Sequence, residues 1–336
     1  MKKFLIYLLS LVCILFLIPS VFTKKKKESL AKTDEAVESI QEEIYQKYNY
    51  KNYKTIKLYH SKSDKIEELP IDEYLYGVVS AEIPVSYNIE ALKAQAVAAR
   101  TYTLYQIIHS NGKHGDADIC DNFACCQAWI SKEDRLSKWN EEDRDSNWNK
   151  IIQAVDSTQG KIITYNGEPI DAFFHSNSGG ITETASNVWG GANFPYLQSV
   201  ETSGEDMYSQ YKSEVKLTKE ELLSKLKEKK EDIQINWDEP DQIQILEYTE
   251  SGRVKTMKFG NSQIPGTQVR TILGLKSTNF TFELTENNIK FTVTGYGHGV
   301  GMSQTGADAL ANSGNTYEQI LKHYYSGVEI NYINET

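Results

Sequence analysis

An uncharged apolar run of 19 residues near the amino terminus constrains this chain more than any other feature. It extends from Phe4 to Phe22, after the basic start of residues 1–3 and before the lysines of residues 24–27. A run of this length can cross the hydrocarbon core of a bilayer as one helix. A cleaved signal peptide usually has a shorter apolar core and small residues before the cleavage point. Residues 18–23 contain no such site, so we expect an uncleaved single-pass anchor at residues 4–22, with residues 1–3 as a cytoplasmic tip.

The orientation of this anchor is not decided by charge alone, because lysines flank both ends of the run and the lysines of residues 24–27 oppose export of the carboxyl side. The rest of the chain holds no other apolar run long enough to return it across the membrane. Exported enzymes commonly carry an N-terminal anchor of this kind. We therefore expect a protein of the cell membrane whose body lies on the extracytoplasmic side.

The charge of the body excludes one class of partner. Apolar residues make up 40% of the 336 residues and charged residues 24%, which is ordinary globular usage. Residues 31–336 carry 30 basic and 45 acidic side chains, a net charge of −15. A surface this acidic repels nucleic-acid phosphates, so we expect no nucleic acid among the partners.

Hydrophobic periodicity predicts an α+β body at residues 56–331, preceded by a polar linker or amphipathic stalk at residues 23–55. Helices are expected at 71–83, 88–109 and 141–158, a charged helix at 213–231, and one or two helices at 303–325. Strands are expected at 161–165 and 170–175, around the Asn166-Gly167 turn, and in alternation at 243–293. The fold class is therefore a mixed helix and antiparallel-sheet body, with a β-rich subdomain at about residues 213–295.

Glu82 is the first candidate for chemistry. It precedes Ile83-Pro84, and proline pushes its predecessor out of the α region, so Glu82 is expected in the last turn of its helix. The negative end of the helix dipole and nearby apolar groups both raise the pKa of a carboxyl group at this position. A raised pKa suits a general acid at neutral pH. The other interpretation is a solvated surface glutamate at a helix end.

Two small-residue segments can admit a ligand close to the backbone. His175 and Ser176 begin a segment that continues to Gly180, and neither serine in it has the G-x-S-x-G surroundings of a nucleophile elbow. The second segment, residues 295–301, alternates glycine with other residues and contains His298. Its spacing does not fit a dinucleotide fingerprint. A glycine ribbon that presents His298 to a substrate and a structural turn are the two interpretations.

His114, Cys120 and Cys126 recur every six residues in a loop. Two thiolates and an imidazole with one open position make a zinc arrangement. The alternatives are free structural thiols, or a disulfide between Cys120 and either Cys125 or Cys126 in an exported protein. Both zinc and these alternatives stay open at this point.

Four stretches taken together resemble one family. They are residues 72–84, residues 90–102, residues 174–180 with Val188-Trp189-Gly190-Gly191 and Pro195-Tyr196-Leu197, and residues 297–307 with His323-Tyr324-Tyr325-Ser326-Gly327. In this order they closely resemble the stage II sporulation protein D family, over roughly residues 56–330 and the anchor.

The resemblance implies a membrane-anchored lytic transglycosylase that acts on peptidoglycan during engulfment in sporulation. It also implies a substrate of glycan strands already stripped of stem peptides, and stage II sporulation proteins P and M as partners. The family's catalytic acid matches Glu82. Its cleft positions map onto Gln95, Arg100, Tyr102, His175, Ser176, Ser178, Gly180 and His298. The cysteines are not part of the broad family pattern, so zinc bound by His114, Cys120 and Cys126 would be a lineage-specific addition.

The implied chemistry agrees with the presence of one carboxylate in the long motifs. An ordinary glycosidase needs two carboxyl groups that flank the scissile bond. A lytic transglycosylase needs one, because the C6 hydroxyl of N-acetylmuramic acid is the nucleophile and is already held on the sugar. Glu82 would protonate the glycosidic oxygen and then accept the hydroxyl proton as the 1,6-anhydro ring closes. This chemistry does not require zinc.

Two other functions remain open from the sequence. A zinc-dependent amidase or peptidase would use His114, Cys120 and Cys126 with Glu82 as the base, although the chain lacks an H-E-x-x-H motif. A glycan-binding scaffold without enzymatic activity would need none of these groups as a catalyst.

Overall fold

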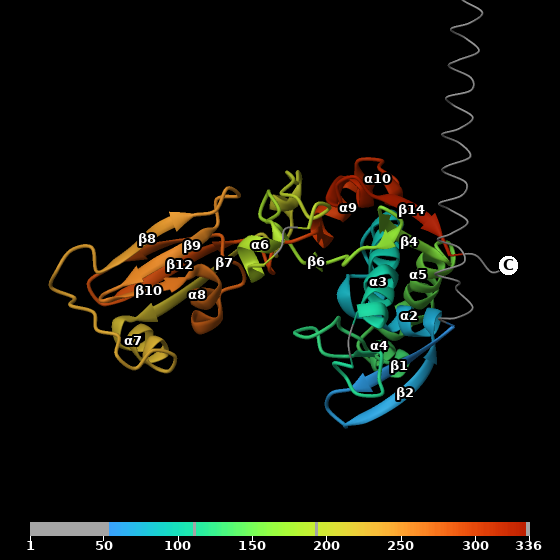
Figure 1. Ribbon diagram of the computed structural model, residues 1–336, viewed down its shortest axis with the longest axis horizontal. Coiled ribbons are helices and arrows are strands. Elements are labelled where there is room, and N and C mark those ends of the chain that lie inside the picture. Colours follow the sequence, from blue (N-terminus) through green and yellow to red (C-terminus); the bar gives the residue numbers. More distant parts are fainter. Residues whose placement is uncertain (1–53, 110–111, 192–193, 334–336) are drawn as a thin grey trace, which may run out of the picture. The chain divides into compact units, whose positions relative to one another are not determined.

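The computed structural model describes residues 54–109, 112–191 and 194–333 (Figure 1). The expected anchor and tip, and residues 23–53 of the expected linker, lie outside the described residues. Within those ranges no helix combines the length and the apolar character needed to cross a bilayer. The elements are, in chain order, β1 Thr55–His60, β2 Lys65–Pro70, α2 Ile71–Glu82, α3 Ile89–His109, β3 Ile119–Cys120, α4 Lys132–Ser137, η2 Glu141–Asp143, α5 Arg144–Asp156, β4 Lys161–Tyr165, β5 Glu168–Pro169, β6 Phe174–His175, α6 Ala185–Trp189, η3 Glu205–Met207, β7 Lys212–Thr218, α7 Lys219–Lys227, β8 Ile243–Tyr248, β9 Val254–Phe259, β10 Ser262–Pro265, α8 Gly266–Leu273, β11 Phe280–Leu284, β12 Asn288–Thr294, β13 Met302–Ser303, α9 Gln304–Asn312, α10 Tyr317–Tyr324 and β14 Glu329–Tyr332.

Helix α3 forms the centre of the first core, and it contacts α2, α5, α9, α10 and β4. Asn88 caps its start, because its side-chain oxygen accepts a hydrogen bond from the backbone N–H of Glu90 at 3.0 Å. Five alanines of α3 are fully buried: Ala91, Ala94, Ala96, Ala98 and Ala99. Short side chains let neighbouring elements approach the helix on several sides, as expected for a helix that is apolar all round.

Small sheets accompany these helices. β1 pairs antiparallel with β2 and parallel with β3, and β4 pairs antiparallel with β5 and β14. The β4–β5 turn is the expected Asn166-Gly167 pair, and both residues have positive φ, 51° and 82°. β6 pairs parallel with β13, which sets Phe174 beside Met302 and His175 beside Ser303. This pairing brings the two small-residue segments of the sequence together.

A second core lies within residues 212–294. Two three-stranded antiparallel sheets, β10-β9-β8 and β11-β12-β7, supply it together with α7 and α8. Its largest fully buried apolar side chains include Met257, Phe259 and Phe291. Strands and helices thus both contribute to the described residues, and the α+β class is confirmed.

The structure corrects one predicted element and adds another. Residues 213–231 do not form one charged helix, because residues 212–218 are strand β7 and only Lys219–Lys227 is helical. Val215 and Leu217 alternate with polar residues and pair with β12, and Thr218 begins α7 with a capping box that includes Glu221. Within residues 243–293, which were expected to hold alternating strands, Gly266–Leu273 is instead helix α8.

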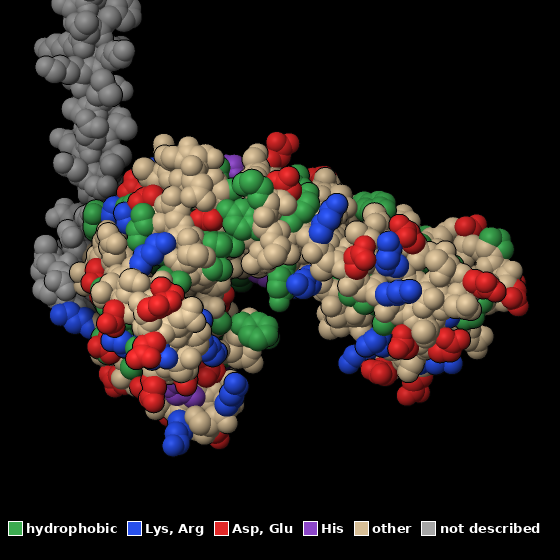
Figure 2. Space-filling view, turned by 180° about the vertical axis from the view of Figure 1, so that it is seen from behind, with side chains coloured by type: hydrophobic (Ala, Val, Ile, Leu, Met, Phe, Trp, Pro, Cys, Tyr) green, Lys and Arg blue, Asp and Glu red, His purple; other side chains and the backbone are tan. Residues whose placement is uncertain are grey.

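Acidic and basic side chains are interspersed over the face that Figure 2 shows. Among the described residues of this face no large patch of Lys and Arg gathers.

Candidate active site

Glu82 is the last residue of α2, and the chain leaves the helix directly after it. Ile83 is extended, with φ −125° and ψ 139°, and it is followed by Pro84. A cavity of about 400 Å³ opens beside this helix end. The cavity is lined by Ser80, Ala81, Glu82, Ile83, Pro84, Val85, Ser86, Arg135 and Trp139. The proline therefore ends the helix at the position that presents the Glu82 carboxyl group to a cavity.

The Glu82 carboxyl group is half-buried and has two donors. Its Oε1 accepts a hydrogen bond from the backbone N–H of Ala128 at 2.5 Å, and the Gln304 side chain provides a second hydrogen bond. Burial raises the pKa of Glu82 to about 7, because loss of solvation outweighs these two hydrogen bonds, which favour the charged form. A carboxyl group with this pKa can both donate and accept a proton near neutrality.

Gln95 and Gln304 form a buried pair behind Glu82. Gln95 is fully buried on α3, and its Oε1 accepts a hydrogen bond from Gln304 Nε2 at 3.4 Å. Gln304 begins α9, whose cap is the Ser303 side chain. Gln95 Nε2 has no hydrogen-bond partner among the described residues. Gln95 thus acts on Glu82 through Gln304, and its own amide keeps an unused donor.

His175 and His298 belong to an aromatic group that also includes Tyr102, Phe173 and Trp189. The two histidine rings lie 5.5 Å apart, and the Trp189 ring is 5.1 Å from the His298 ring. Phe173 lies 6.1 Å from the rings of both Tyr102 and His298. Trp189 is 51% exposed, which leaves an aromatic face open to a ligand.

Both histidines are neutral at physiological pH. Burial and the nearby Arg253 charge together lower the pKa of His175 to about 3, and burial lowers the pKa of His298 well below its usual value. His175 Nδ1 donates to the carbonyl of Val300 at 3.1 Å, so Nε2 is an unprotonated acceptor, and it is buried without a partner among the described residues. The backbone N–H of Val300 donates to His298 Nδ1 at 3.1 Å. Neither ring is therefore a general acid near neutrality.

Ser178 and Gly180 hold a buried carboxylate. Glu205 accepts hydrogen bonds from the side chains of Ser178, Thr202, Ser303 and Thr305 and from the backbone N–H of Ser178 and Gly180. Burial alone would raise its pKa, but these donors outweigh burial and hold the pKa of Glu205 below its usual value. The Ser178 hydroxyl is committed to Glu205, so it is not an activated nucleophile. Ser176 is half-buried, and its carbonyl accepts from the backbone N–H of Thr305 at 3.0 Å.

Arg100 lies elsewhere than the sequence resemblance implied. Its side chain is fully buried, and its guanidinium donates to the carbonyls of Thr158 at 2.8 Å, Lys161 at 3.2 Å and Val155 at 3.3 Å. Asp72 is 3.8 Å away. The Val155 carbonyl belongs to the last turn of α5 and the other two follow the helix, in a region where backbone acceptors need partners. The contacts give Arg100 a structural role, and it does not line the cavity beside Glu82.

The three predicted metal ligands lie together, and a fourth joins them. The donor atoms of His114, Cys120, Cys125 and Cys126 are all within 4.8 Å of one another. His114 Nε2 lies 3.2 Å from Cys126 Sγ and 3.9 Å from Cys125 Sγ. The three thiols are free, with no disulfide among them. Sequence reasoning left Cys125 out of the ligand set, although its position between two candidate ligands in a short loop was a usable signal.

The cysteine loop also reaches the carboxyl group. Two residues after Cys126, Ala128 donates its N–H to Glu82. Between them, Gln127 is buried, and its Nε2 donates to the hydroxyls of Tyr74 at 2.8 Å and Thr103 at 2.9 Å. The conformation of this segment therefore sets one of the two donors to Glu82.

A second carboxyl group of raised pKa escaped sequence reasoning. Asp171 follows the β5 hairpin, is buried, and has one carboxyl oxygen, Oδ1, without a partner among the described residues. Burial raises its pKa to about 7, although Gln106 and Lys113 favour its charged form. An aspartate next to the buried Ile170 and Ala172 was a signal for this site.

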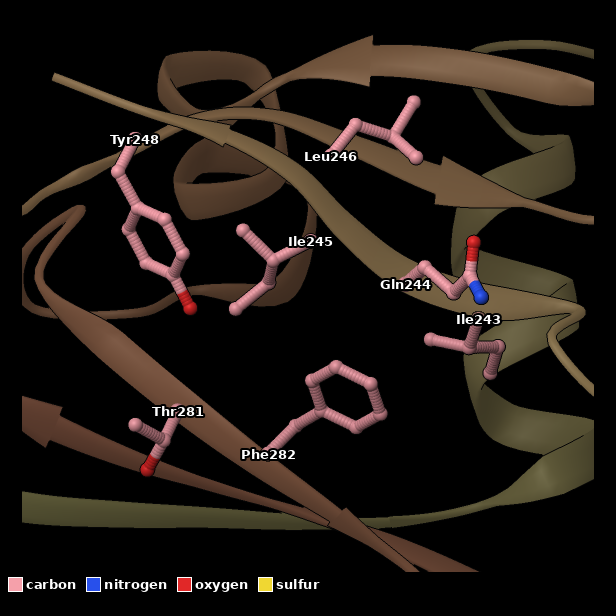
Figure 3. A pocket seen from close by; sticks show the side chains of 7 residues that line it. All are labelled: Ile243, Gln244, Ile245, Leu246, Tyr248, Thr281 and Phe282. Atoms are coloured by element: carbon pink, nitrogen blue, oxygen red, sulfur yellow. The ribbon is translucent and has the colours of Figure 1, made fainter.

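A larger cavity, of about 520 Å³, lies between β8 and β11. Figure 3 shows its lining, in which Ile245, Tyr248 and Phe282 point into the space between the two strands. Its lining contains no carboxylate, histidine, cysteine or cation. This cavity lacks groups for acid–base or metal chemistry, so the smaller cavity beside Glu82 is the candidate active site.

Comparison with known proteins finds relatives that align with nearly the whole chain. A family model described as stage II sporulation protein matches residues 59–165, and a model described as a domain of unknown function matches residues 201–301. The stage II sporulation protein D of Bacillus subtilis (strain 168) is 33% identical over 342 residues, which cover 98% of this chain and 96% of the relative. The chain belongs to the stage II sporulation protein D family. The member from Bacillus amyloliquefaciens is 36% identical over 82% of this chain and 78% of its own length.

The chain is also similar to a protein that carries a different name. The amidase enhancer of Bacillus subtilis (strain 168) is 30% identical over 307 residues, which cover 76% of this chain and 40% of the enhancer. Membership makes this chain a sporulation protein of the stage II D family. The matched ranges include Glu82 and the cysteine cluster in the first model, and Glu205, Arg253 and His298 in the second.

Proposed function

We propose that this protein is a peptidoglycan lytic transglycosylase that acts in engulfment during sporulation. The observation that carries the proposal is the Glu82 carboxyl group, which is half-buried beside a cavity of about 400 Å³ and has a pKa raised to about 7. Family membership supports the sporulation role. The substrate is the bond between N-acetylmuramic acid and N-acetylglucosamine in glycan strands from which stem peptides have been removed.

One group can perform both proton transfers of this reaction. Protonated Glu82 donates to the glycosidic oxygen as the bond to C1 of N-acetylmuramic acid breaks, and the N-acetylglucosamine leaves as an alcohol. The C6 hydroxyl then bonds to C1, and ionised Glu82 takes its proton as the 1,6-anhydro ring closes. Glu82 is protonated again at the end. The hydrogen bonds from Ala128 and Gln304 stabilise the carboxylate between the two steps.

Zinc belongs to this proposal as a structural ion held by His114, Cys120, Cys125 and Cys126. A tetrahedral zinc site places nitrogen and sulfur donors about 3.5–3.8 Å apart. His114 Nε2 lies 3.2 and 3.9 Å from the Sγ atoms of Cys126 and Cys125, and all four donor atoms lie within 4.8 Å of one another. Bound there, zinc would cross-link the loop that presents the Ala128 N–H to Glu82. Four protein donors leave no open position for a water molecule, which disfavours the zinc amidase or peptidase alternative.

Location and partners complete the proposal. An anchor at residues 4–22 would hold the body on the extracytoplasmic side of the cell membrane, in the intermembrane space during engulfment. The partners proposed from the family resemblance are peptidoglycan glycan strands and stage II sporulation proteins P and M.

The deciding experiment incubates the full chain, purified in mild detergent, with peptide-free glycan strands and weighs the products by mass spectrometry. Glu82→Gln is the test variant. Glu73→Gln is its matched control, because Glu73 is an exposed residue of the same helix. We expect new 1,6-anhydro ends from the native protein and from Glu73→Gln, and none from Glu82→Gln.

Other products would point elsewhere. Reducing ends would mean hydrolysis, and Asp171 would then be the first candidate for the second carboxyl group. Retention of glycan by all three proteins without any cleavage would favour the scaffold function.

A further inference from the structure

Arg135 is a cation at the candidate active site whose side chain has no hydrogen-bond or ion-pair partner among the described residues. It lies on α4, is half-buried, and lines the same cavity as Glu82. Its Nε is buried and has no hydrogen-bond partner among the described residues. The guanidinium carbon lies 5.7 Å from the centre of the Trp139 ring, which also lines the cavity. Its sequence neighbours Glu133 and Asp134 are exposed and form no ion pair with it within the described ranges.

This arrangement is costly unless a ligand completes it. Burial lowers the pKa of Arg135 by removing its solvation, but an arginine stays charged in proteins. Partial desolvation of a guanidinium whose donors are unused raises its free energy. Hydrogen bonds to an anionic partner offset this cost. The cation–π contact with the Trp139 ring uses none of the guanidinium N–H donors, so the fork stays available to a ligand. The chemistry of the site therefore selects a carboxylate or a similar planar anion.

The proposed substrate carries such a group next to the scissile bond. The lactyl substituent on O3 of each N-acetylmuramic acid ends in a carboxyl group. In intact peptidoglycan that carboxyl group is an amide of the stem peptide and has no charge, whereas removal of the peptide frees it as a carboxylate. The N-acetylmuramic acid whose C1 reacts must lie beside Glu82, so its lactyl group lies in or at the mouth of the same cavity.

We propose that Arg135 is a specificity-determining residue that binds the free lactyl carboxylate of N-acetylmuramic acid, with Trp139 as the surface that orients it. This inference rests on the proposed function and deepens it. A bidentate guanidinium–carboxylate contact forms only with a stripped strand, whereas an amidated lactyl group leaves the guanidinium unpaired. Selection for stripped glycan then arises inside the active site, in addition to any steric exclusion of peptides.

The test measures binding in the Glu82→Gln full chain, purified in mild detergent, so that no turnover interferes. Three probes of equal length are titrated by isothermal calorimetry: peptide-free glycan, the same glycan with its lactyl carboxyl groups converted to methylamides, and a chito-oligosaccharide without lactyl groups. Charge-assisted hydrogen bonds to a carboxylate are strong enough for about a tenfold difference in affinity. We expect the free-carboxylate glycan to bind about tenfold more tightly than the other two.

Variants assign this difference to Arg135. Arg135→Gln should bring the affinity for the free-carboxylate glycan down to that for the methylamide. Arg135→Lys should keep part of the difference, because it retains the charge and loses the fork. Lys138→Gln is the matched control, since it removes the same charge from an exposed residue three positions further on, and it should keep the full difference. Circular dichroism checks that each variant is folded.

Each contrary result has a defined meaning. If the Glu82→Gln chain, with Arg135 unchanged, binds the free and methylamidated glycans with equal affinity, the inference is overturned before any Arg135 variant is measured. An equal loss for all three probes on Arg135→Gln also overturns it, since Arg135 would then only support the cavity. The proposed function fails separately, when the native protein distinguishes the glycans but forms no 1,6-anhydro ends. Absence of binding to every glycan overturns both.

Discussion

At the scale of single residues, burial and hydrogen bonding act in opposite directions on the pKa of Glu82. Partial burial favours the neutral acid, whereas the N–H of Ala128 and the Gln304 amide favour the carboxylate. Burial prevails and the pKa rises to about 7. A proton donor that must later accept a proton works best near this balance. A catalytic role of Glu82, as proposed above, would therefore come at a cost in stability.

The pH dependence of activity follows from this pKa. The proposed reaction begins with protonated Glu82, so kcat/KM should decrease as the pH rises above about 7, by up to tenfold per pH unit. A pH–rate profile on peptide-free glycan from pH 5 to 9 measures the alkaline limb. Glu73→Gln should give the same profile. Activity that stays constant up to pH 9 contradicts Glu82 as the acid.

The same pKa predicts a stability change. The folded protein binds a proton at Glu82 between pH 4.5 and 7 that the unfolded chain releases, so native stability should fall as the pH rises through this range. Glu82→Gln removes the effect. We expect this variant to exceed the native protein in stability by about 2–3 kcal/mol at pH 8.5 and to differ little from it at pH 4.5. Urea denaturation at both pH values measures it, and an equal difference at both would contradict the assignment.

At the scale of elements, the end of α5 depends on a side chain from α3. Arg100 donates to three carbonyls there and is fully buried. Arg100→Ala leaves these acceptors unpaired and opens a cavity, so it should lower the free energy of unfolding by about 3 kcal/mol or more. Arg100→Lys should lose less of the free energy of unfolding than Arg100→Ala does. An Arg100→Ala variant with the melting temperature of the native protein but without glycan binding would instead support a substrate-binding role for Arg100.

The cysteine loop is the second element whose role can be tested. We expect about one zinc ion per chain in purified protein, measured by mass spectrometry of the metal. Cys126→Ser should lower the zinc content, the melting temperature and the activity together, because the loop also positions Ala128. Cys13→Ser, in the expected anchor, is the matched control. Metal-free native protein whose activity survives Cys126→Ser would remove zinc from the proposal.

At the scale of the whole molecule, one arginine ties the β-rich region to the segment near the histidines. Arg253 precedes β9 and is buried, and its Nη2 donates to the carbonyls of Ser178 at 2.6 Å and Ile181 at 2.9 Å. Glu183 on the same segment accepts from Thr249 at 2.6 Å and Ser251 at 2.7 Å. These contacts join residues far apart in the sequence into one buried polar network.

Loss of this arginine should therefore affect the site and not only stability. Arg253→Met should lower the melting temperature and reduce kcat/KM on peptide-free glycan about tenfold or more, because the segment from Ser178 to Ile181 loses its support. Lys255→Met is the control, since Lys255 forms an exposed ion pair with Glu247, and it should change neither quantity appreciably. Equal effects of the two variants would contradict a special role for Arg253.

Several features could be predicted from the sequence: the helix that ends at Glu82, the alanine-rich α3, the Asn166-Gly167 hairpin and the α+β class. These features depend on local rules: proline ends a helix, a capping asparagine begins one, and Asn-Gly fits the tight turn. Three of the four residues of the His/Cys cluster could also be found by their spacing, since they lie in one short loop.

The surroundings of these residues depend on contacts between distant segments and could not be predicted from local patterns. β7 is a strand because β12 pairs with it. Arg100 is structural because the end of α5 meets α3 at its guanidinium. The donors to Glu82 come from residues 128 and 304, and its cavity is completed by Arg135 and Trp139, all distant from residue 82 in the sequence. Burial and desolvation depend on contacts between such distant segments, so the pKa of a carboxyl group and the partners of a cation are fixed only when the chain has folded.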